Sequence, residues 1–461
     1  MVTFVAVAVY AIYFSVTTVS IHQGLGTSAY DFGLYEQGIW LLSRGKTPFV
    51  TLMGRNLFGD HTSFILLLVA PLMWIFTSTS MLFVVQSVVI ACGAIPVYAY
   101  ARKTLASDAL GCVMACSYLL YPAVGWTNVE NFHPDSFLGV LIGIALWAAL
   151  GKRWRWYGVA VVLALLVKED VVLVIVPLGI FVALRRDVRI GIATILGSIA
   201  TALIFFLVVI RHLTGSAFRN SWRIPFGGFG GLVKTAFTSP ATLLAYLKSD
   251  GRVTYLMQTL FPTGFVFLVA PSVAAIGCMV LLSNIVSTYS YQFQIQYHYS
   301  LVVAPILVFG NVYAIGRLGV LARRRATMVV GVSALVAAFL LAPLPFARNQ
   351  VQKFPPSSPA VGAAHQLFAQ IPSDAVISVY HPLTAQLARR ERVYAFPNPF
   401  QRSHYGPDIF ARGDRLPFAH EIEFVMLPIV LTAASQTVWQ LEIRDYVWVA
   451  SNEWWVLYRH R

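Results

Sequence analysis

The chain alternates between long apolar runs and short polar clusters. Apolar runs recur from residues 2–19 through 81–100 and 190–210 to 326–344, and many of them end in Lys or Arg. A helix needs about 20 apolar residues to cross a membrane, and basic residues beside such helices mark the cytoplasmic side. The pattern predicts an all-α polytopic membrane domain over residues 1–346, with about 11 transmembrane helices and a cytoplasmic N-terminus.

Some apolar runs are interrupted. Lys168, Glu169 and Asp170 divide the run 157–184, which we interpret either as one kinked helix or as two short helices with the charges at the turn. Basic residues at both ends favour two helices with an outer turn. Residues 253–286, broken by two prolines, are expected to form two short spans. Residues 64–76 are too short to cross and indicate a re-entrant or interfacial helix.

This topology places the polar clusters on one face of the membrane. Two long outer loops are expected at residues 21–80 and 211–252. The first contains Tyr30-Asp31-Phe32-Gly33-Leu34-Tyr35-Glu36, which we expect to be a loop lying against the membrane face. Carboxylates beside a bilayer are costly unless they are solvated or take part in the function of the protein. The clustering of polar groups on this face therefore indicates an outer functional site.

The last part of the chain has a different pattern. Residues 347–461 alternate between apolar and polar stretches and carry turn residues. Strands are expected at 375–380, 393–396, 446–449 and 454–458, with a short helix at 383–390. The pattern predicts a small extracytoplasmic α/β domain.

Composition narrows the function classes. The chain of 461 residues is 58% hydrophobic and 11% charged, with a mean hydropathy of +0.70, which excludes a soluble globular protein. The net charge of +14 comes from clusters beside apolar runs, so it indicates topology and not nucleic-acid binding. All four cysteines lie inside apolar runs and predict no disulfide framework. The first apolar run lacks a basic leader and is expected to be retained.

The outer polar groups predict an amphipathic substrate with its head in a pocket and its chain between helices. A lipid-linked phosphate needs cations to hold its oxygens, and transfer to a hydroxyl needs a carboxylate base. Asp31 is the predicted base, with Glu36 as its partner. The remaining candidate substrate-binding residues are Asp60, His61, His133, Lys168, Glu169, Asp170, Arg211, Arg219, Arg223 and His298.

Each candidate also has a purely structural interpretation. Asp60 and His61 fit a loop turn, and Asp135 is expected to cap the following helix. Lys168 to Asp170 fit an internally paired turn, and His298 fits an aromatic belt at the membrane surface. The arginines fit contacts with membrane lipids. The acids and histidines show no tight ligand spacing, so no cofactor is expected and a divalent metal is not favoured.

Several motifs together resemble a known family. They are residues 31–40, Asp60-His61, Phe132-His133-Pro134-Asp135, Lys168-Glu169-Asp170, Tyr297-His298-Tyr299 and Ile371-Pro372-Ser373-Asp374-Ala375. They resemble the bacterial membrane protein family of unknown function 2079 (DUF2079), which is similar to the C-type glycosyltransferase (GT-C) superfamily. The resemblance implies a polyprenyl-phosphate sugar donor, a cell-envelope glycan or lipid acceptor, and a place in the bacterial inner membrane. It also implies that Asp31 is the key acid of the first outer loop.

Two other functions fit parts of the pattern. A transporter or flippase of a lipid-linked or small polar substrate would place its polar site near the midplane between repeats. The chain shows no clear repeat, and its polar clusters lie at one face, which favours an enzyme. A non-catalytic membrane scaffold would tolerate replacement of Asp31 and Lys168.

Overall fold

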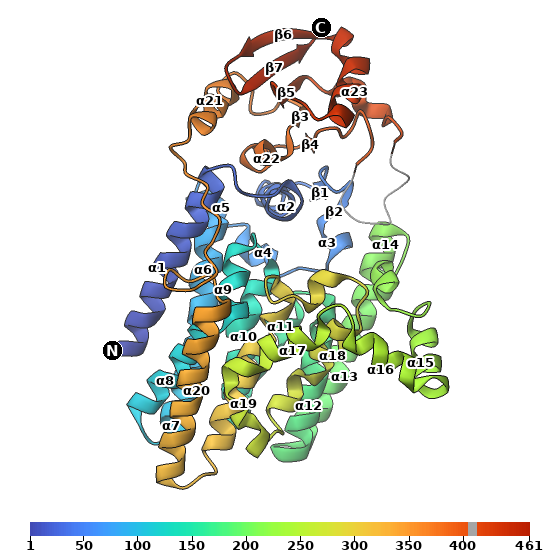
Figure 1. Ribbon diagram of the computed structural model, residues 1–461. Helices are drawn as coiled ribbons and strands as arrows, with labels where there is room; N and C mark the ends of the chain where they lie inside the picture. Colours follow the sequence, from blue (N-terminus) through green and yellow to red (C-terminus); the bar gives the residue numbers. More distant parts are fainter. Residues whose placement is uncertain (404–412) are drawn as a thin grey trace.

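The computed structural model describes residues 1–403 and 413–461. A bundle of apolar helices forms one part, and the C-terminal sheet lies above it in Figure 1. Residues 21–80, which we call the first outer segment after their predicted position, contribute elements that lie between these two parts. They are α2 (Leu34–Ser43), β1 (Phe49–Val50), β2 (Arg55–Asn56) and α3 (Leu57–Asp60).

Among the described residues, five helical segments are long and apolar enough to cross a membrane. They are α1 (Val2–Gln23), α6 with α7 (Met81–Cys92, Ala94–Thr104), α13 through α14 (Val188–Ile204, Arg211–Thr214), a segment His298–Ile315 ending in α19 (Val303–Ile315), and α20 (Val320–Leu341). A sixth is formed if α8 (Asp108–Leu119) and α9 (Pro122–Val129), bent by 46°, make one span. The larger number of about 11 stays a prediction.

Shorter apolar helices complete the bundle. They are α4 and α5 (Leu66–Val69, Leu72–Ile75), α10 (Leu138–Leu150) after a 3-10 turn, α11 (Trp154–Leu165) and α18 (Cys278–Val286). Polar caps begin two of the bundle helices: Ser107 accepts a hydrogen bond from Leu110 N–H in α8, and Asp187 accepts from Arg189 and Ile190 N–H in α13. Such caps pair amides that the helix itself leaves unpaired.

The interrupted run 157–184 forms two helices. Lys168 is extended, a 3-10 turn covers Glu169–Val171, and α12 (Val172–Arg185) follows. The amide N–H of Ile65 donates to Leu166 C=O, and Glu169 contacts His61 and Thr62 of the first outer segment. The predicted break at the charge cluster is therefore confirmed.

Residues 253–286 differ from the expected pair of spans. They form α17 (Arg252–Leu260), three 3-10 turns and then α18. Pro262 and Pro271 interrupt the helical hydrogen bonds, and Gly264 has a φ of +58°. α15 (Phe229–Thr238) and α16 (Pro240–Lys248) precede this segment at the edge of the bundle in Figure 1.

Residues 29–43 are helical, so the expectation of a loop around Asp31 is wrong. A wide π-helical turn, Ala29–Gly33, leads directly into α2, and the Ser28 hydroxyl accepts from Tyr30 N–H at its start. The apolar side chains of Phe32, Leu34 and Ile39 are buried by this arrangement. Their burial against the core stabilises a helix that the glycines alone would disfavour.

The C-terminal residues form a five-stranded mixed sheet in the order β4-β3-β5-β7-β6. β3 (Ile377–Val379) pairs in parallel with β4 (Val393–Ala395) and β5 (Phe424–Pro428), whereas β7 (Trp455–His460) runs antiparallel to β5 and β6 (Tyr446–Ser451). The accompanying helices are α21 (Pro359–Phe368), α22 (His381–Thr384) and α23 (Ala433–Glu442). The four predicted strands coincide with β3, β4, β6 and β7; β5 was not expected.

The C-terminal part contacts α2 through buried polar groups. Glu36, with no exposed surface, forms an ion pair with Arg389, whose Nη2 also donates to the carbonyl of Ser78 at 2.7 Å. Gln37 Nε2 donates to Thr51 Oγ1 at 2.9 Å and to Glu391 C=O at 3.0 Å. These contacts attach the sheet to the helix that directly follows Asp31.

Candidate functional site

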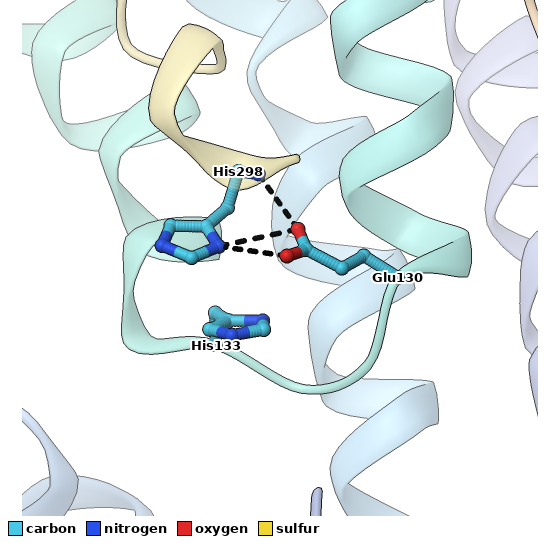
Figure 2. A group of neighbouring side chains, drawn as sticks. All are labelled: Glu130, His133 and His298. Atoms are coloured by element: carbon cyan, nitrogen blue, oxygen red, sulfur yellow. Dashed lines mark hydrogen bonds and ion pairs between the residues drawn. The ribbon is translucent and has the colours of Figure 1, made fainter. Parts of the chain in front are cut away.

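Asp31 lies beside a row of buried rings. Its Oδ1 is 4.0 Å from Nε2 of His133, and its side chain is 35% exposed. The His133 ring is stacked on the His298 ring, with centroids 4.0 Å apart and an interplanar angle of 22°. Nδ1 of His298 lies 3.1 Å from Glu130 Oε1, and the backbone N–H of His298 donates to Glu130 Oε2 at 2.6 Å (Figure 2).

Two segments of the chain supply Glu130, His133 and His298. Glu130 follows α9, His133 precedes the 3-10 turn Pro134–Phe137, and His298 begins the segment that leads into α19. The amide of Gln86 in α6 holds the connection between Glu130 and His133. It donates to the carbonyl of Asn131 at 2.9 Å and accepts from His133 N–H at 3.0 Å.

Lys168 occupies the break between α11 and α12. Its Nζ is 3.7 Å from Asp135 Oδ1 and 3.8 Å from Asp170 Oδ2, and it lies 5.4 Å from the ring centroid of Tyr299. The predicted capping role of Asp135 is wrong, because His133 occupies the cap position and the Asp135 carboxylate is turned to Lys168. A buried ammonium needs such counter-charges.

A second ionic group lies at the end of α3. Arg55 Nε donates to Asp60 Oδ1 at 3.1 Å, and Arg219 Nη1 donates to the carbonyl of Gly59 at 3.0 Å. His61 Nδ1 is 2.7 Å from Glu169 Oε1. The first outer segment, the α11–α12 break and residues 219–223 are thereby brought together.

These groups border a cavity of about 430 Å³. Its polar lining includes Asp60, His61, Glu169, Asp170, Arg219 and Arg223. Apolar side chains, among them Leu173, Phe206, Ile210, Phe229 and Leu282, line the rest. A pocket of this size with a polar side and an apolar side suits an amphipathic ligand.

Aromatic rings connect Asp31 with the cavity. The stacked histidines are followed by Tyr299, whose ring centroid is 4.2 Å from that of His298, and then by Tyr289 at 6.4 Å from Tyr299. The Tyr289 ring lies 4.5 Å from the guanidinium carbon of Arg223. Among the described residues, the Nε of Arg223 is buried and has no hydrogen-bond partner, while the side chain as a whole is half-buried. A guanidinium with an unpaired buried N–H beside the cavity favours an anionic ligand.

The environment of the site raises the pKa of two carboxyl groups and lowers the pKa of a third. Burial raises the pKa of Asp31, opposed by His133, and raises the pKa of Glu130 to about 7, again opposed by His133. Burial would also raise the pKa of Asp60, but Arg55 and His61 outweigh it and hold that pKa well below its usual value. Asp31 and Glu130 are therefore better proton acceptors than ordinary carboxylates, whereas Asp60 stays ionised.

Most of the predicted site residues converge. Asp31, His133 and His298 form the ring row, and Asp60, His61, Glu169, Asp170, Arg219 and Arg223 line the cavity, with Lys168 in contact with Asp170. Two predicted residues lie elsewhere. The Glu36 carboxylate is paired with Arg389, and Arg211 is exposed on α14 outside the cavity lining.

The structure also adds residues that sequence reasoning passed over. Glu130 stands three positions before His133, but the chain between them is not helical, so their meeting could not be inferred from a helical spacing. Tyr289 carries no distinguishing pattern, because aromatic residues are common beside membranes. Tyr299 stood out only as part of the Tyr297-His298-Tyr299 motif. The ligand atoms of Glu130, His133 and His298 lie within 4.8 Å of one another, so this group has the donor set for a metal ion.

The chain was compared with protein families, curated proteins and solved structures. The DUF2079 family, described as "Predicted membrane protein (DUF2079)", matches residues 21–411. None of the curated proteins matches.

The solved structures include two of ArnT from Cupriavidus metallidurans. The one bound to undecaprenyl phosphate is 13% identical, with a TM-score of 0.52 over 99% of this chain and 97% of that one. The apo structure is 12% identical, with a TM-score of 0.45 over 98% of both chains. The first similarity shows a common fold along nearly the whole length.

Proposed function

The chain belongs to the DUF2079 family of predicted membrane proteins, and we propose that it is a glycosyltransferase of the bacterial cell membrane. It transfers a sugar from a polyprenyl-phosphate donor to a glycan or lipid acceptor of the cell envelope, on the outer face. The fold is similar to that of the GT-C superfamily. The ArnT structure with this fold contains undecaprenyl phosphate, which supports a polyprenyl-phosphate partner here.

The observation that carries this proposal is the joining of Asp31 to an amphipathic cavity. One side of the cavity offers Arg219 and Arg223 for phosphate oxygens, and the other offers apolar side chains for a lipid chain. The ring row from His133 to Tyr289 connects these arginines with Asp31. A carboxylate and a phosphate-binding cation near one membrane face are the groups that this transfer requires.

The proposed reaction is an inverting displacement at the anomeric carbon. The acceptor hydroxyl oxygen forms a bond with this carbon while the bond from the carbon to the phosphate oxygen breaks. Asp31 accepts the hydroxyl proton, and polyprenyl phosphate leaves with the bonding electrons. The raised pKa of Asp31 suits a base that acts near neutral pH.

The cations divide into different roles in this proposal. Arg223 holds the leaving phosphate, assisted by Arg219, and stabilises the charge that develops on it. Lys168 is 4% exposed and already neutralised by Asp135 and Asp170, so it orders the wall of the site. Glu36 fastens α2 to the C-terminal part through Arg389. We assign Arg211 no role in donor binding.

The test compares wild type with Asp31→Asn in lipid nanodiscs. A panel of polyprenyl-phosphate sugars is supplied with cell-envelope extract as acceptor, and released polyprenyl phosphate is measured. We expect release by wild type and a loss of at least about 100-fold in Asp31→Asn, since general-base catalysis contributes about 10²–10⁴. Glu453→Gln, an exposed acid of the C-terminal part, is the matched control and retains wild-type rates.

The outcomes separate the function classes. Equal release by wild type and Asp31→Asn contradicts the assignment of the base. No release from any donor, by protein that remains folded, contradicts the transferase. Movement of intact donor across the bilayer would then indicate a flippase, and neither activity would indicate a scaffold.

A further inference from the structure

Glu130, His133 and His298 are arranged as metal ligands more than as a simple hydrogen-bonded group. Their ligand atoms lie within 4.8 Å of one another. His133 and His298 are 5% and 7% exposed, so water is largely kept from the imidazoles. Figure 2 shows the two rings stacked, with Glu130 reaching toward them from the end of α9.

A hydrogen-bonded pair accounts for only part of this group. The Glu130 carboxylate forms hydrogen bonds with Nδ1 and with the backbone N–H of His298. His133 remains unexplained by that pair. Its Nδ1 is 3.3 Å from the carbonyl of Asn131, and its Nε2 makes no hydrogen bond within the described ranges, with Asp31 Oδ1 at 4.0 Å. An imidazole nitrogen that makes no hydrogen bond can bind a metal ion.

Neighbouring side chains hold this part of the chain in place. Gln86 bonds both sides of the Glu130–His133 connection, and its side chain is fully buried. Tyr35 and Tyr299 lie beside the outer faces of the pair, with ring centroids 5.8 Å from His133 and 4.2 Å from His298. Supporting contacts of this kind fix the orientation of metal-binding histidines in other proteins.

We propose that Glu130, His133 and His298 bind one divalent transition-metal ion of the zinc class. Two imidazoles and one carboxylate form the protein ligand set of zinc sites that keep a fourth position open. Imidazole nitrogen favours zinc over magnesium, which prefers oxygen ligands. The ion binds through His133, His298 and one Glu130 oxygen, after the Glu130–His298 hydrogen bond opens. The inference stands apart from the proposed transfer, because binding needs neither donor nor acceptor.

The test measures zinc binding by the full-length protein. Tag-free protein in nanodiscs is stripped with a chelator and then titrated with Zn²⁺ against a fluorescent zinc chelator. We expect one equivalent of Zn²⁺ per chain in wild type. Affinity should fall at least about 10-fold in Glu130→Gln, His133→Gln and His298→Gln, as for the loss of other ligands and their supports. His365→Gln, an exposed histidine on α21, keeps wild-type affinity.

A second measurement does not depend on variants that fold. X-ray absorption of wild-type protein loaded with one Zn²⁺ should show a nitrogen and oxygen shell with two imidazoles. Mg²⁺ at the same concentration should leave the thermal unfolding temperature unchanged, whereas Zn²⁺ raises it. A shell without imidazole, or equal zinc affinity in wild type and in the His133→Gln, His298→Gln double variant, overturns the proposal. Asp31→Asn separates the zinc-site hypothesis from the transferase hypothesis, since this variant should lose sugar transfer and keep zinc binding.

Discussion

Arg219 and Arg223 stand at the two ends of one short 3-10 turn, yet their guanidinium groups have different surroundings. Arg219 donates to Gly59 C=O and lies 3.9 Å from Asp60. Arg223 instead stacks on Trp222 and Tyr289, and its Nε is buried without a hydrogen bond. An unpaired buried N–H is costly, so this contrast identifies Arg223 as the guanidinium that can bind an anion.

The first prediction concerns donor binding by Arg223. Arg223→Ala should raise KM for the donor about 10- to 100-fold, since hydrogen bonds to charged groups contribute about 1.5–3 kcal/mol. Arg223→Lys should recover part of this, because it restores the charge but not the planar donor pair. Steady-state kinetics checks both variants beside Arg348→Ala, an exposed arginine in the linker. An unchanged KM in Arg223→Ala contradicts the assignment.

The second prediction concerns the pH dependence of stability. Burial raises the pKa of Glu36 to about 7, although Arg389 opposes this, whereas an unfolded glutamate titrates near about 4.3. The folded chain holds this proton more tightly, so the associated stability is complete below about pH 4.3 and is lost as pH rises to about 7. Between about pH 5 and 8, Tm of Glu36→Gln should fall less than Tm of wild type. Parallel curves would show that Glu36 does not titrate in this range.

At the scale of elements, the break between α11 and α12 is held by charge. Lys168 is extended where helix would otherwise continue, and its ammonium joins Asp135 from the α10 turn with Asp170 of its own turn. Breaking a buried ion pair by removing one partner costs about 3–5 kcal/mol, because the other charge stays buried. The cluster thus packs α10 against the α11–α12 break.

The third prediction tests the coupling of Lys168 to Asp135 with a double-mutant cycle. Lys168→Met should lower the apparent Tm by about 5 °C or more, as expected for the loss of several kcal/mol. Adding Asp135→Asn should restore at least half of that loss, since the stranded carboxylate charge is removed. Thermal unfolding in detergent provides the measurement, with Lys353→Met of the exposed linker as control. Strictly additive losses would show that the two charges are not coupled.

For the whole molecule, the bundle and the C-terminal sheet lie on opposite sides of α2, β1, β2 and α3 (Figure 1). The α19–α20 connection lies at the far end of the bundle from the sheet in Figure 1. The sheet, α2 and α3 lie toward the other end. From the positive-inside rule we expect the basic residues after Gly319 to lie in the cytoplasm and the sheet to lie outside.

The fourth prediction is this topology. Gly319 and Gly362 are exposed, and a side chain added at either would meet no atom within 4 Å. In a variant lacking the four natural cysteines, Gly362→Cys should react with an impermeant maleimide added to intact spheroplasts. Gly319→Cys should react only after the membrane is opened. The reverse labelling would invert the topology, and labelling of both in intact spheroplasts would contradict an odd number of spans between them.

The sequence alone determined the membrane class, the break at Lys168 and four of the five described C-terminal strands, and it predicted the grouping of Asp31, His133, Lys168 and His298. These features depend on local hydropathy and on basic residues at helix ends, which neighbouring residues specify. The helical state of residues 29–43 escaped prediction, because burial against distant segments stabilises it. β5 escaped because a short apolar run fits a strand or a buried helix equally.

Only the tertiary structure decided which side chains touch. Glu130 meets His298 across 168 positions, and Glu36 meets Arg389 across 353. Such pairs depend on how helices cross and how the sheet attaches to α2, and no local pattern records those angles. The same packing separates Arg223, half-buried in the cavity wall, from Arg211, exposed on α14. Long-range packing thus turned a list of polar residues into one site, because side-chain chemistry requires contact within a few ångströms.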